Sequence, residues 1–228
     1  MRIIFVRHAY PDYENDCITP LGHKQAAAAA IRLESEGIEK IYSSPMGRAQ
    51  ETAGYTAQRL GLDVEVRAWM HEIGGWGPKT LYAGGNPWYT SWRMVEEGQS
   101  ITDRDWASKL PFSENAVCAL VDRAGKRFDE LLYTLGYERV GEYYRVLEEK
   151  PYDTVAVFSH AGFSCAVISH IFNLPFPFVC NSLNPDVTAI TIASFANAKI
   201  GTLVSPSFEI ACDARHIKGI TEGTVIQK

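Results

Sequence analysis

The stretch IIFVRHA, residues 3–9, and the later stretch TVAVFSHAG, residues 154–162, share one design. In each, a short apolar run of the kind found in strands buried on both faces is followed at once by a polar end with a histidine. A strand that leaves the core often ends in solvated polar residues, so one such stretch alone would carry little weight. The repeat predicts that His8 and His160 follow two neighbouring buried strands.

Predicted strands and helices alternate on either side of these stretches. Apolar runs predict strands at 2–6, 38–44, 64–67, 154–159, 188–194 and 201–210. Apolar residues at helical spacing predict helices at 21–37, 45–61, 116–135 and 163–173. Thr19 and Pro20 supply an N-cap and a first helical residue, whereas residues 137–149 either continue a helix or form a hairpin. The alternation predicts an α/β fold of three layers, with a mainly parallel central sheet flanked by helices.

Length and composition limit the class of protein. With 228 residues, of which 46% are hydrophobic, the chain can form one domain over 1–228 with a well-buried core. The net charge of -5 argues against nucleic-acid binding by general electrostatics, and no apolar run approaches the roughly 20 residues that span a bilayer. The first residues lack a signal-peptide pattern, and the five cysteines lack CxxC spacing. We therefore expect a cytoplasmic protein that binds neither nucleic acid nor membrane.

Four side chains are expected to meet at one edge of the sheet. The carboxyl ends of parallel strands border the ligand crevice of open α/β sheets, and His8 and His160 both follow such ends. Arg7 stands beside His8, and Arg48 falls in the first turn of a predicted helix, where backbone N–H groups favour an anion. Arginine binds phosphate through paired hydrogen bonds. Arg7, His8, Arg48 and His160 therefore predict a site for a phosphoryl group, which we call the phosphate pocket.

The chemistry that fits this pocket is phosphoryl transfer. A neutral histidine can attack phosphorus and form a covalent intermediate, while cations stabilise the charge on the equatorial oxygens. The leaving alkoxide then needs a proton from a nearby carboxyl group. Glu72 follows the third predicted strand and precedes a glycine-rich turn, which makes it the best candidate, although an ordinary exposed loop glutamate fits the same pattern.

Motifs along nearly the whole chain resemble the histidine phosphatase superfamily, which includes the cofactor-dependent phosphoglycerate mutases. They are RHA at 7–9 in place of the usual Arg-His-Gly, ITPLGHKQA at 18–26, SSPMGRAQETA at 43–53, Glu72 with GGWG at 74–77, SHAG at 159–162 and CDARHI at 212–217. The resemblance implies that His8 is the phosphorylated nucleophile, with Glu72 as proton donor and later base. It gives His160 a catalytic and phosphate-binding role and implies that neither a metal nor an organic cofactor is needed.

The resemblance also suggests residues that contact the substrate, and it shows departures from the family pattern. The candidate substrate-binding residues are Glu14, Asn15, Trp76 and His216. Mutases usually carry an asparagine where this chain has Glu14, and a carboxylate there would repel a second anionic group on the substrate. This favours a phosphatase that acts on a small phosphorylated metabolite. Ala9, in place of glycine, adds a methyl where the backbone often passes close to the phosphate.

The segment 78–113 is an insertion rich in aromatic residues. It is either a lid that covers the phosphate pocket and selects the leaving group, or a small core that packs onto the domain or onto a second subunit. The oligomeric state stays open, with a homodimer as one option.

Two other functions stay open beside the phosphatase. One is a cofactor-dependent phosphoglycerate mutase, and the other is a phosphate-binding scaffold that has lost turnover, for which Ala9 would be the hint. A cysteine phosphatase is not indicated, because none of the five cysteines has an arginine at Cys-x5-Arg spacing. The sequence also lacks the Walker loop GxxxxGK[ST].

Overall fold

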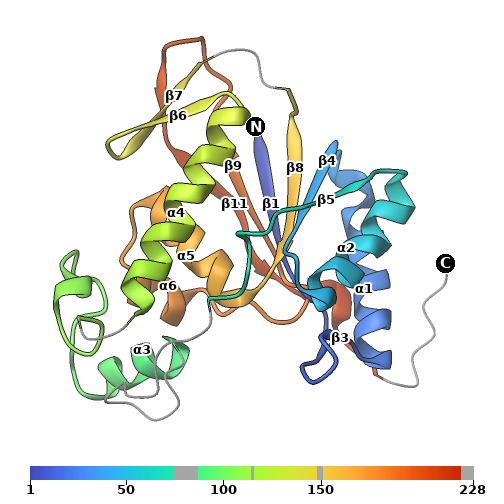
Figure 1. The fold of residues 1–228 in the computed structure, drawn as a ribbon, viewed down its shortest axis with the longest axis horizontal. Coiled ribbons are helices and arrows are strands. Elements are labelled where there is room, and N and C mark those ends of the chain that lie inside the picture. Colours follow the sequence, from blue (N-terminus) through green and yellow to red (C-terminus); the bar gives the residue numbers. More distant parts are fainter. Residues whose placement is uncertain (74–86, 114–115, 148–150, 222–228) are drawn as a thin grey trace.

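A six-stranded sheet forms the centre of the protein (Figure 1), whose computed structural model describes residues 1–73, 87–113, 116–147 and 151–221. The strand order is β11-β9-β1-β8-β4-β5. The bounds are β1 (Arg2–Arg7), β4 (Lys40–Ser43), β5 (Val64–Val66), β8 (Thr154–Ser159), β9 (Ile190–Phe195) and β11 (Pro206–Asp213). β1, β8, β4 and β5 are parallel, whereas β9 runs antiparallel to both of its neighbours. The predicted α/β fold with a mainly parallel sheet is confirmed.

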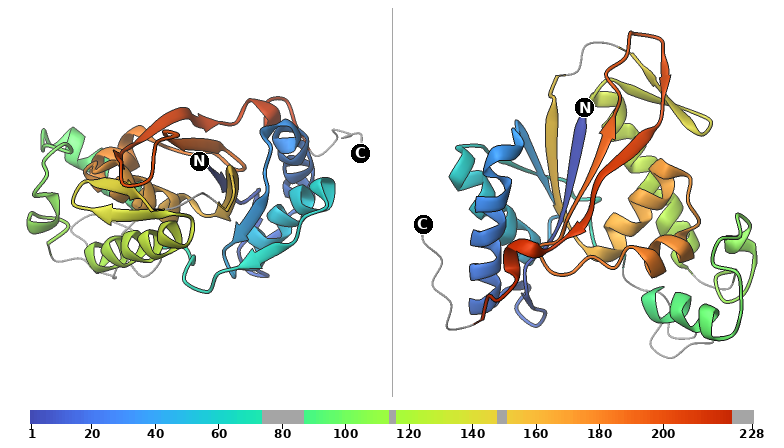
Figure 2. Two further views of the ribbon diagram at one scale, coloured as in Figure 1. Left: turned by 90° about the horizontal axis from the view of Figure 1, so that it is seen from above. Right: turned by 180° about the vertical axis from the view of Figure 1, so that it is seen from behind.

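Helices cover both faces of the sheet, which gives the three predicted layers (Figures 1 and 2). One face carries α1 (Pro20–Leu33) and α2 (Gly47–Leu60). The other carries α4 (Val117–Thr134) and α5 (Ala161–Phe172), with the short α6 (Phe176–Ser182) beside them. None of the helices that the structure describes is both long and apolar enough to cross a bilayer.

The side chains of β1 alternate between the two halves of the core. Ile3 and Phe5 lie in the cluster with the residues of α4 and α5, and the ring of Phe5 is 5.6 Å from that of Phe128. Ile4 and Val6 lie in the cluster with α1 and α2. Because successive strand residues point to opposite faces, a continuous apolar run is what a strand with helices on both sides requires.

The first helix begins as predicted and ends earlier. The Thr19 side chain accepts a hydrogen bond from the Gly22 N–H at 3.1 Å, as an N-cap does. The prediction that the helix runs to residue 37 is wrong at this end, because α1 stops at Leu33. A 3₁₀ turn over Glu34–Glu36 follows, and Gly37 ends it at a φ of 70° that glycine adopts readily.

Short strands fill two regions that the sequence left open. Within the open region 137–149, residues 137–146 form a hairpin of β6 (Tyr137–Val140) and β7 (Tyr143–Val146), to which β10 (Leu203–Val204) adds a third strand. The predicted strand 201–210 is therefore divided between two sheets. Near the N-terminus, β2 (Pro11–Asp12) and β3 (Cys17–Ile18) form a small hairpin within a predicted loop.

The described part of the insertion packs on α6. It contains α3 (Pro87–Glu96) and a 3₁₀ turn over Trp106–Ser108. The Trp106 ring lies 5.2 Å from Phe112 and 5.6 Å from Phe176 of α6, and Phe112 is buried. These contacts form a small aromatic core. Residues 78–86 of the expected lid lie outside the described residues, and its role as a lid stays a prediction.

Candidate active site

The strand register brings His8 and His160 together at the carboxyl edge of the sheet. Arg7 of β1 is paired with Ser159 of β8 in the parallel register, so each histidine comes one residue after a paired position. The His8 N–H donates to the Ser159 carbonyl at 2.9 Å. The two imidazole centroids are 5.2 Å apart, and both rings are buried.

His8 is held as a neutral imidazole with one nitrogen free. Its Nδ1 lies 2.8 Å from the Ala9 carbonyl oxygen, and a carbonyl only accepts, so Nδ1 carries the proton. Nε2 therefore keeps its lone pair. Burial lowers the pKa of His8 to about 4, and the charges of Arg7 and Arg48 act in the same direction. At neutral pH this side chain is therefore uncharged.

His160 directly precedes α5 and contacts a residue at the end of β4. Its Nε2 is 2.7 Å from the Ser44 hydroxyl, and its Nδ1 is buried without a hydrogen-bond partner among the described residues. Burial lowers the pKa of His160 to about 2, helped by the charges of His8, Arg48, His71 and Arg7. His160 can therefore offer its second nitrogen to a ligand.

Two guanidinium groups flank the histidines. Arg48 is the second residue of α2 and is 5% exposed. The Arg7 Nη1 donates to the Pro185 carbonyl at 2.7 Å. The Nε atoms of Arg7 and Arg48 are buried and have no partner among the described residues. The pocket thus combines two fixed positive charges with two neutral imidazoles.

An acidic residue of the β2–β3 hairpin already contacts the Arg48 side of the pocket. Asp16 pairs with the Arg48 guanidinium through Oδ1, and its Oδ2 accepts the Gly47 N–H at 2.8 Å. A Cβ on Gly47 would lie 2.2 Å from the Asp16 carbonyl oxygen, so only glycine permits this approach. The ring of Tyr13, in the same hairpin, lies 5.3 Å from the Arg48 guanidinium and 6.4 Å from the His8 ring. The hairpin therefore supplies an anion and an aromatic ring to the pocket.

The Glu72 carboxyl group is fixed at the N-terminus of α5. Its Oε1 accepts the N–H groups of Ile73 at 2.8 Å and Phe163 at 3.0 Å, and its Oε2 accepts that of Gly162 at 3.4 Å. Burial raises the pKa of Glu72, and this outweighs the three N–H groups and the charge of Arg7, which favour the carboxylate. Glu72 thus holds a proton more readily than an ordinary glutamate.

Gly162 makes room for this carboxyl group. A Cβ at position 162 would lie 2.7 Å from the Glu72 Oε1, closer than a real Cβ contact. The segment that carries Glu72 is itself fixed, because the Ser159 hydroxyl donates to the Met70 carbonyl at 3.2 Å and Met70 and Ile73 are buried. Glycine in the SHAG motif therefore positions Glu72.

Comparisons with known proteins agree with this geometry. A sequence model of the histidine phosphatase superfamily (branch 1) matches residues 3–205. The chain belongs to the histidine phosphatase superfamily. No curated protein matches it in sequence.

Solved structures share the fold of this chain at low sequence identity. A phosphoserine phosphatase variant from Entamoeba histolytica, in complex with phosphoserine, is 18% identical with a TM-score of 0.64, over 95% of this chain and 98% of that chain. A mycobacterial glucosyl-3-phosphoglycerate phosphatase with inorganic phosphate is 22% identical with a TM-score of 0.64, over 94% and 98%. The structure described as mycobacterial hydrolase 2 is 21% identical with a TM-score of 0.63, over 92% and 89%.

Three of the candidate substrate-binding residues form their hydrogen bonds with residues other than the two histidines. Glu14 and Asn15 are in the turn of the β2–β3 hairpin, where both backbone N–H groups donate to Asp12. His216 is 2.9 Å from the Thr188 hydroxyl, and the Thr188 N–H donates to the His8 carbonyl, so Thr188 connects His216 to the site. Trp76 lies outside the described residues. None of these contacts shows a substrate-binding role for Glu14, Asn15 or His216.

Ala9 has an apolar role in this histidine phosphatase. Its side chain is fully buried in a small cluster with Ile18 and Ala26, and its N–H donates to the Thr52 hydroxyl at 3.0 Å. The extra methyl therefore packs against the β3 and α1 residues. This packing explains why an alanine fits at position 9, which the family pattern alone did not show.

Several residues of the site had no prediction. Ser44 and Gly162 lie inside the motifs SSPMGRAQETA and SHAG, which also contain Arg48 and His160. Their place in these motifs could have indicated that they belong to the site. Asp16 and Tyr13 lie in a stretch without periodicity, and only the hairpin brings them to Arg48. Loop residues of this kind are placed by tertiary structure.

Proposed function

We propose that the protein is a phosphatase that hydrolyses a small phosphomonoester through a phosphohistidine on His8. The observation that carries this proposal is a set of buried nitrogens that have no hydrogen-bond partner among the described residues: Nε of Arg7, Nε of Arg48 and Nδ1 of His160. Buried polar groups without partners are unfavourable and therefore rare. Their gathering around a neutral His8 fits an anionic ligand that supplies the missing acceptors.

The first half-reaction transfers the phosphoryl group to His8. The lone pair of His8 Nε2 attacks phosphorus in line, and the bond between phosphorus and the bridging oxygen breaks. Arg7 and Arg48 stabilise the charge on the equatorial oxygens. Glu72 gives its proton to the leaving oxygen, so the alcohol departs neutral and Glu72 becomes a carboxylate.

The second half-reaction hydrolyses the intermediate. The Glu72 carboxylate takes a proton from water, whose oxygen attacks phosphorus, and the bond between phosphorus and Nε2 breaks. Inorganic phosphate leaves, His8 returns to its neutral state and Glu72 is protonated again. Burial raises the pKa of Glu72, which favours the protonated form that the first step needs and makes the carboxylate a stronger base for the second.

His160 supports the same steps through its hydrogen bonds. The Ser44 oxygen accepts the Met46 N–H at 3.2 Å, and its hydroxyl proton is available to His160 Nε2. In that tautomer the ring proton is on Nδ1, which donates to a phosphoryl oxygen. A bound dianion also favours the imidazolium form of His160, since an opposite charge raises a histidine pKa.

The structural relatives support the same reaction class, since two of them are described as phosphatases of phosphoserine and of glucosyl-3-phosphoglycerate. In the proposed reaction, Arg7 and Arg48 supply the positive charge. We therefore expect turnover without an added metal.

The test is hydrolysis of p-nitrophenyl phosphate in the presence of a chelator. The wild-type protein should release phosphate, and His8→Ala should reduce the rate by about 10³-fold or more while circular dichroism stays unchanged. Isomerisation of phosphoglycerate after priming would replace the proposal with a mutase. Phosphate binding without turnover of any ester in a broad panel would replace it with a scaffold.

A further inference from the structure

A pocket of about 310 Å³ opens next to Glu72, between α4 and the segment that follows β5. We call it the α4 pocket. Trp69, Leu120 and Phe163 give it apolar walls, and the Trp69 ring is 5.9 Å from that of Phe163. Glu72 lines the same pocket and is close enough to Arg7 to feel its charge. The α4 pocket is thus lined by Glu72, the group that would protonate the leaving oxygen.

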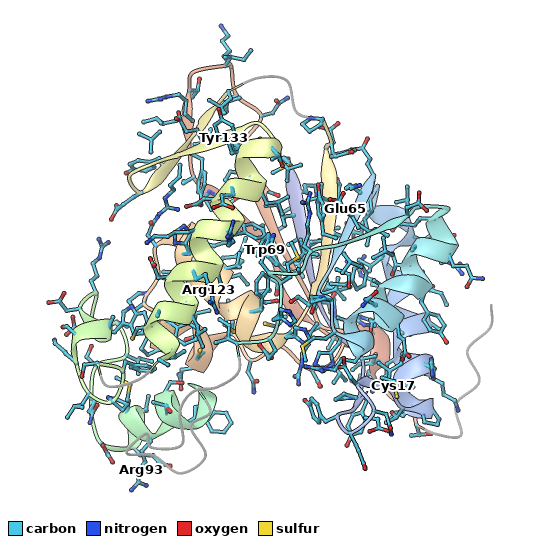
Figure 3. All side chains as sticks on the ribbon, in the orientation of Figure 1. Cys17, Glu65, Trp69, Arg93, Arg123 and Tyr133 are labelled. Atoms are coloured by element: carbon cyan, nitrogen blue, oxygen red, sulfur yellow. The ribbon has the colours of Figure 1, made fainter. Side chains whose placement is uncertain are left out.

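Two arginines of α4 line this pocket. Leu120, Arg123, Ala124 and Arg127 follow the spacing i, i+3, i+4 and i+7, which places them on one face of the helix, and all four line the pocket. Figure 3 labels Arg123 on α4 next to Trp69. The polar groups that line the α4 pocket are thus the Glu72 carboxyl, the His71 imidazole, whose charge also acts on His160, and the guanidiniums of Arg123 and Arg127.

The positive charge of this face is only partly compensated. Arg127 pairs with Glu130 at 2.7 Å, and Lys126, which does not line the pocket, pairs with Asp122 at 2.7 Å. Within the part of the chain that the structure describes, Arg123 forms no ion pair. Like charges four residues apart weaken a helix, so an anion bound between Arg123 and Arg127 would relieve a repulsion that the free protein carries.

We propose that the α4 pocket binds a second anionic group, a carboxylate or a phosphate, on the alcohol part of the substrate. This rests on the proposed function, which puts the phosphoryl group at His8 and the bridging oxygen at Glu72. The rest of the alcohol then passes Glu72 along the apolar wall and ends at Arg123 and Arg127. Arginine holds either anion through paired hydrogen bonds.

The proposal changes the substrate class expected from the sequence. Glu14 argued against a second anion, but its backbone N–H donates to Asp12 in the exposed turn of the hairpin, and Glu14 does not line the α4 pocket. The substrate is a phosphomonoester whose alcohol carries its own negative charge, in preference to a neutral sugar phosphate.

Two matched pairs of substrates test this assignment. O-phosphoserine and O-phosphoethanolamine differ by one carboxylate, and 1,3-propanediol bisphosphate and its monophosphate differ by one phosphate. We expect the wild-type protein to favour the more anionic member of at least one pair by about tenfold in kcat/KM, and the pair that shows the preference identifies the anion. Arg123→Gln should remove most of that preference and change hydrolysis of p-nitrophenyl phosphate by less than about twofold.

Lys126→Gln is the matched control, because it removes one positive charge from the same helix outside the pocket. It should leave the preference unchanged. Equal kcat/KM within both pairs, or an equal loss on all substrates in Arg123→Gln, would overturn the α4 pocket as an anion site while His8-dependent hydrolysis of p-nitrophenyl phosphate still supports the proposed function.

Binding separates the two proposals if hydrolysis fails. Absence of turnover refutes the proposed function, and calorimetry with the four compounds then decides on the α4 pocket. Tighter binding of the more anionic member of a pair, lost in Arg123→Gln and kept in Lys126→Gln, supports the pocket. Equal binding by all three proteins refutes it.

Discussion

The phosphate pocket and the α4 pocket meet at Glu72, yet they are built differently. His8 and His160 are 2% and 0% exposed, and both are fixed by the pairing of β1 with β8. Arg123 and Arg127 are exposed side chains on one face of α4. We infer that the two pockets recognise different parts of the substrate. Buried residues, whose positions the backbone fixes, would bind the phosphoryl group that all phosphomonoesters share. Exposed residues, which can be substituted without disturbing the core, would bind the alcohol, which differs between substrates.

Glu72 lines the α4 pocket and is the proposed acid for the phosphoryl group in the phosphate pocket. We therefore expect its substitution to reduce activity more than any other substitution except that of His8. Glu72→Gln should lower kcat on O-phosphoserine by about 10²–10⁴-fold, because an alkoxide leaves poorly without a proton. With p-nitrophenyl phosphate, whose phenolate leaves unaided, the variant should still release a burst of about one nitrophenolate per enzyme, visible by stopped flow. Equal losses in the first step on both substrates would show that Glu72 is not the acid.

Gly162 tests whether the position of Glu72 matters as much as its charge. Gly162→Ala forces the carboxyl group away from its three N–H donors, because the new Cβ would lie 2.7 Å from the present Oε1. We expect kcat on O-phosphoserine to fall about 10–100-fold. Chemical unfolding should show a decrease of no more than about 1–3 kcal/mol, because the lost hydrogen bonds of a buried carboxyl are partly offset by the greater helix preference of alanine, roughly 0.5–1 kcal/mol. Unchanged kcat would mean that this position of Glu72 is not the catalytic one.

Acid should destabilise the protein through the phosphate pocket. The pKa is lowered to about 4 for His8 and about 2 for His160 by burial, against an ordinary value of 6.5. The unfolded chain therefore binds more protons below about pH 6.5, and stability is lost as the pH falls from there toward the folded pKa values. The slope is up to about 1.4 kcal/mol per pH unit for each histidine.

Urea unfolding of the wild-type protein between pH 8 and pH 5 measures this slope. His8→Gln should be less sensitive to acid than the wild type, whereas His23→Gln, outside the pocket, serves as control. The same slope in His8→Gln and wild type would show that His8 is not protected from protonation.

Asp16 should give the smallest effect, confined to the phosphate pocket. Its carboxylate contacts the same Arg48 guanidinium and Gly47 N–H that an anion would use. Asp16→Asn removes this negative charge and should lower the inhibition constant of inorganic phosphate by about threefold to fivefold, a modest factor because Asp16 is partly exposed. The preference for O-phosphoserine over O-phosphoethanolamine should not change. Weaker inhibition would mean instead that Asp16 holds Arg48 in its working position.

The same contrast explains what the sequence could predict. The continuous apolar runs of β1 and β8 predict strands buried on both faces, and each is followed by a histidine at its carboxyl end. The structure adds that β1 and β8 are neighbours, and their register brings His8 and His160 together. Arg48 follows from its place in the first turn of α2. These features depend on local patterns that only a buried parallel sheet satisfies.

Other features depend on contacts that no local pattern encodes. The two-residue strands of the β2–β3 hairpin are too short for a periodic signal, so Asp16 could not be placed next to Arg48. Arg123 has the spacing of any solvated helix face, and only the packing of Trp69 opposite α4 turns that face into a pocket.

The most direct test of the account is to trap the covalent intermediate. Rapid acid-free quenching of the wild-type protein with phosphorus-labelled O-phosphoserine or p-nitrophenyl phosphate should leave acid-labile, base-stable label on the peptide that contains His8. His8→Ala should carry none, and with p-nitrophenyl phosphate, whose phenolate leaves unaided, Glu72→Gln should accumulate more label than the wild type. Label on another residue, or turnover by the wild type with no trapped phosphorus, would contradict the account.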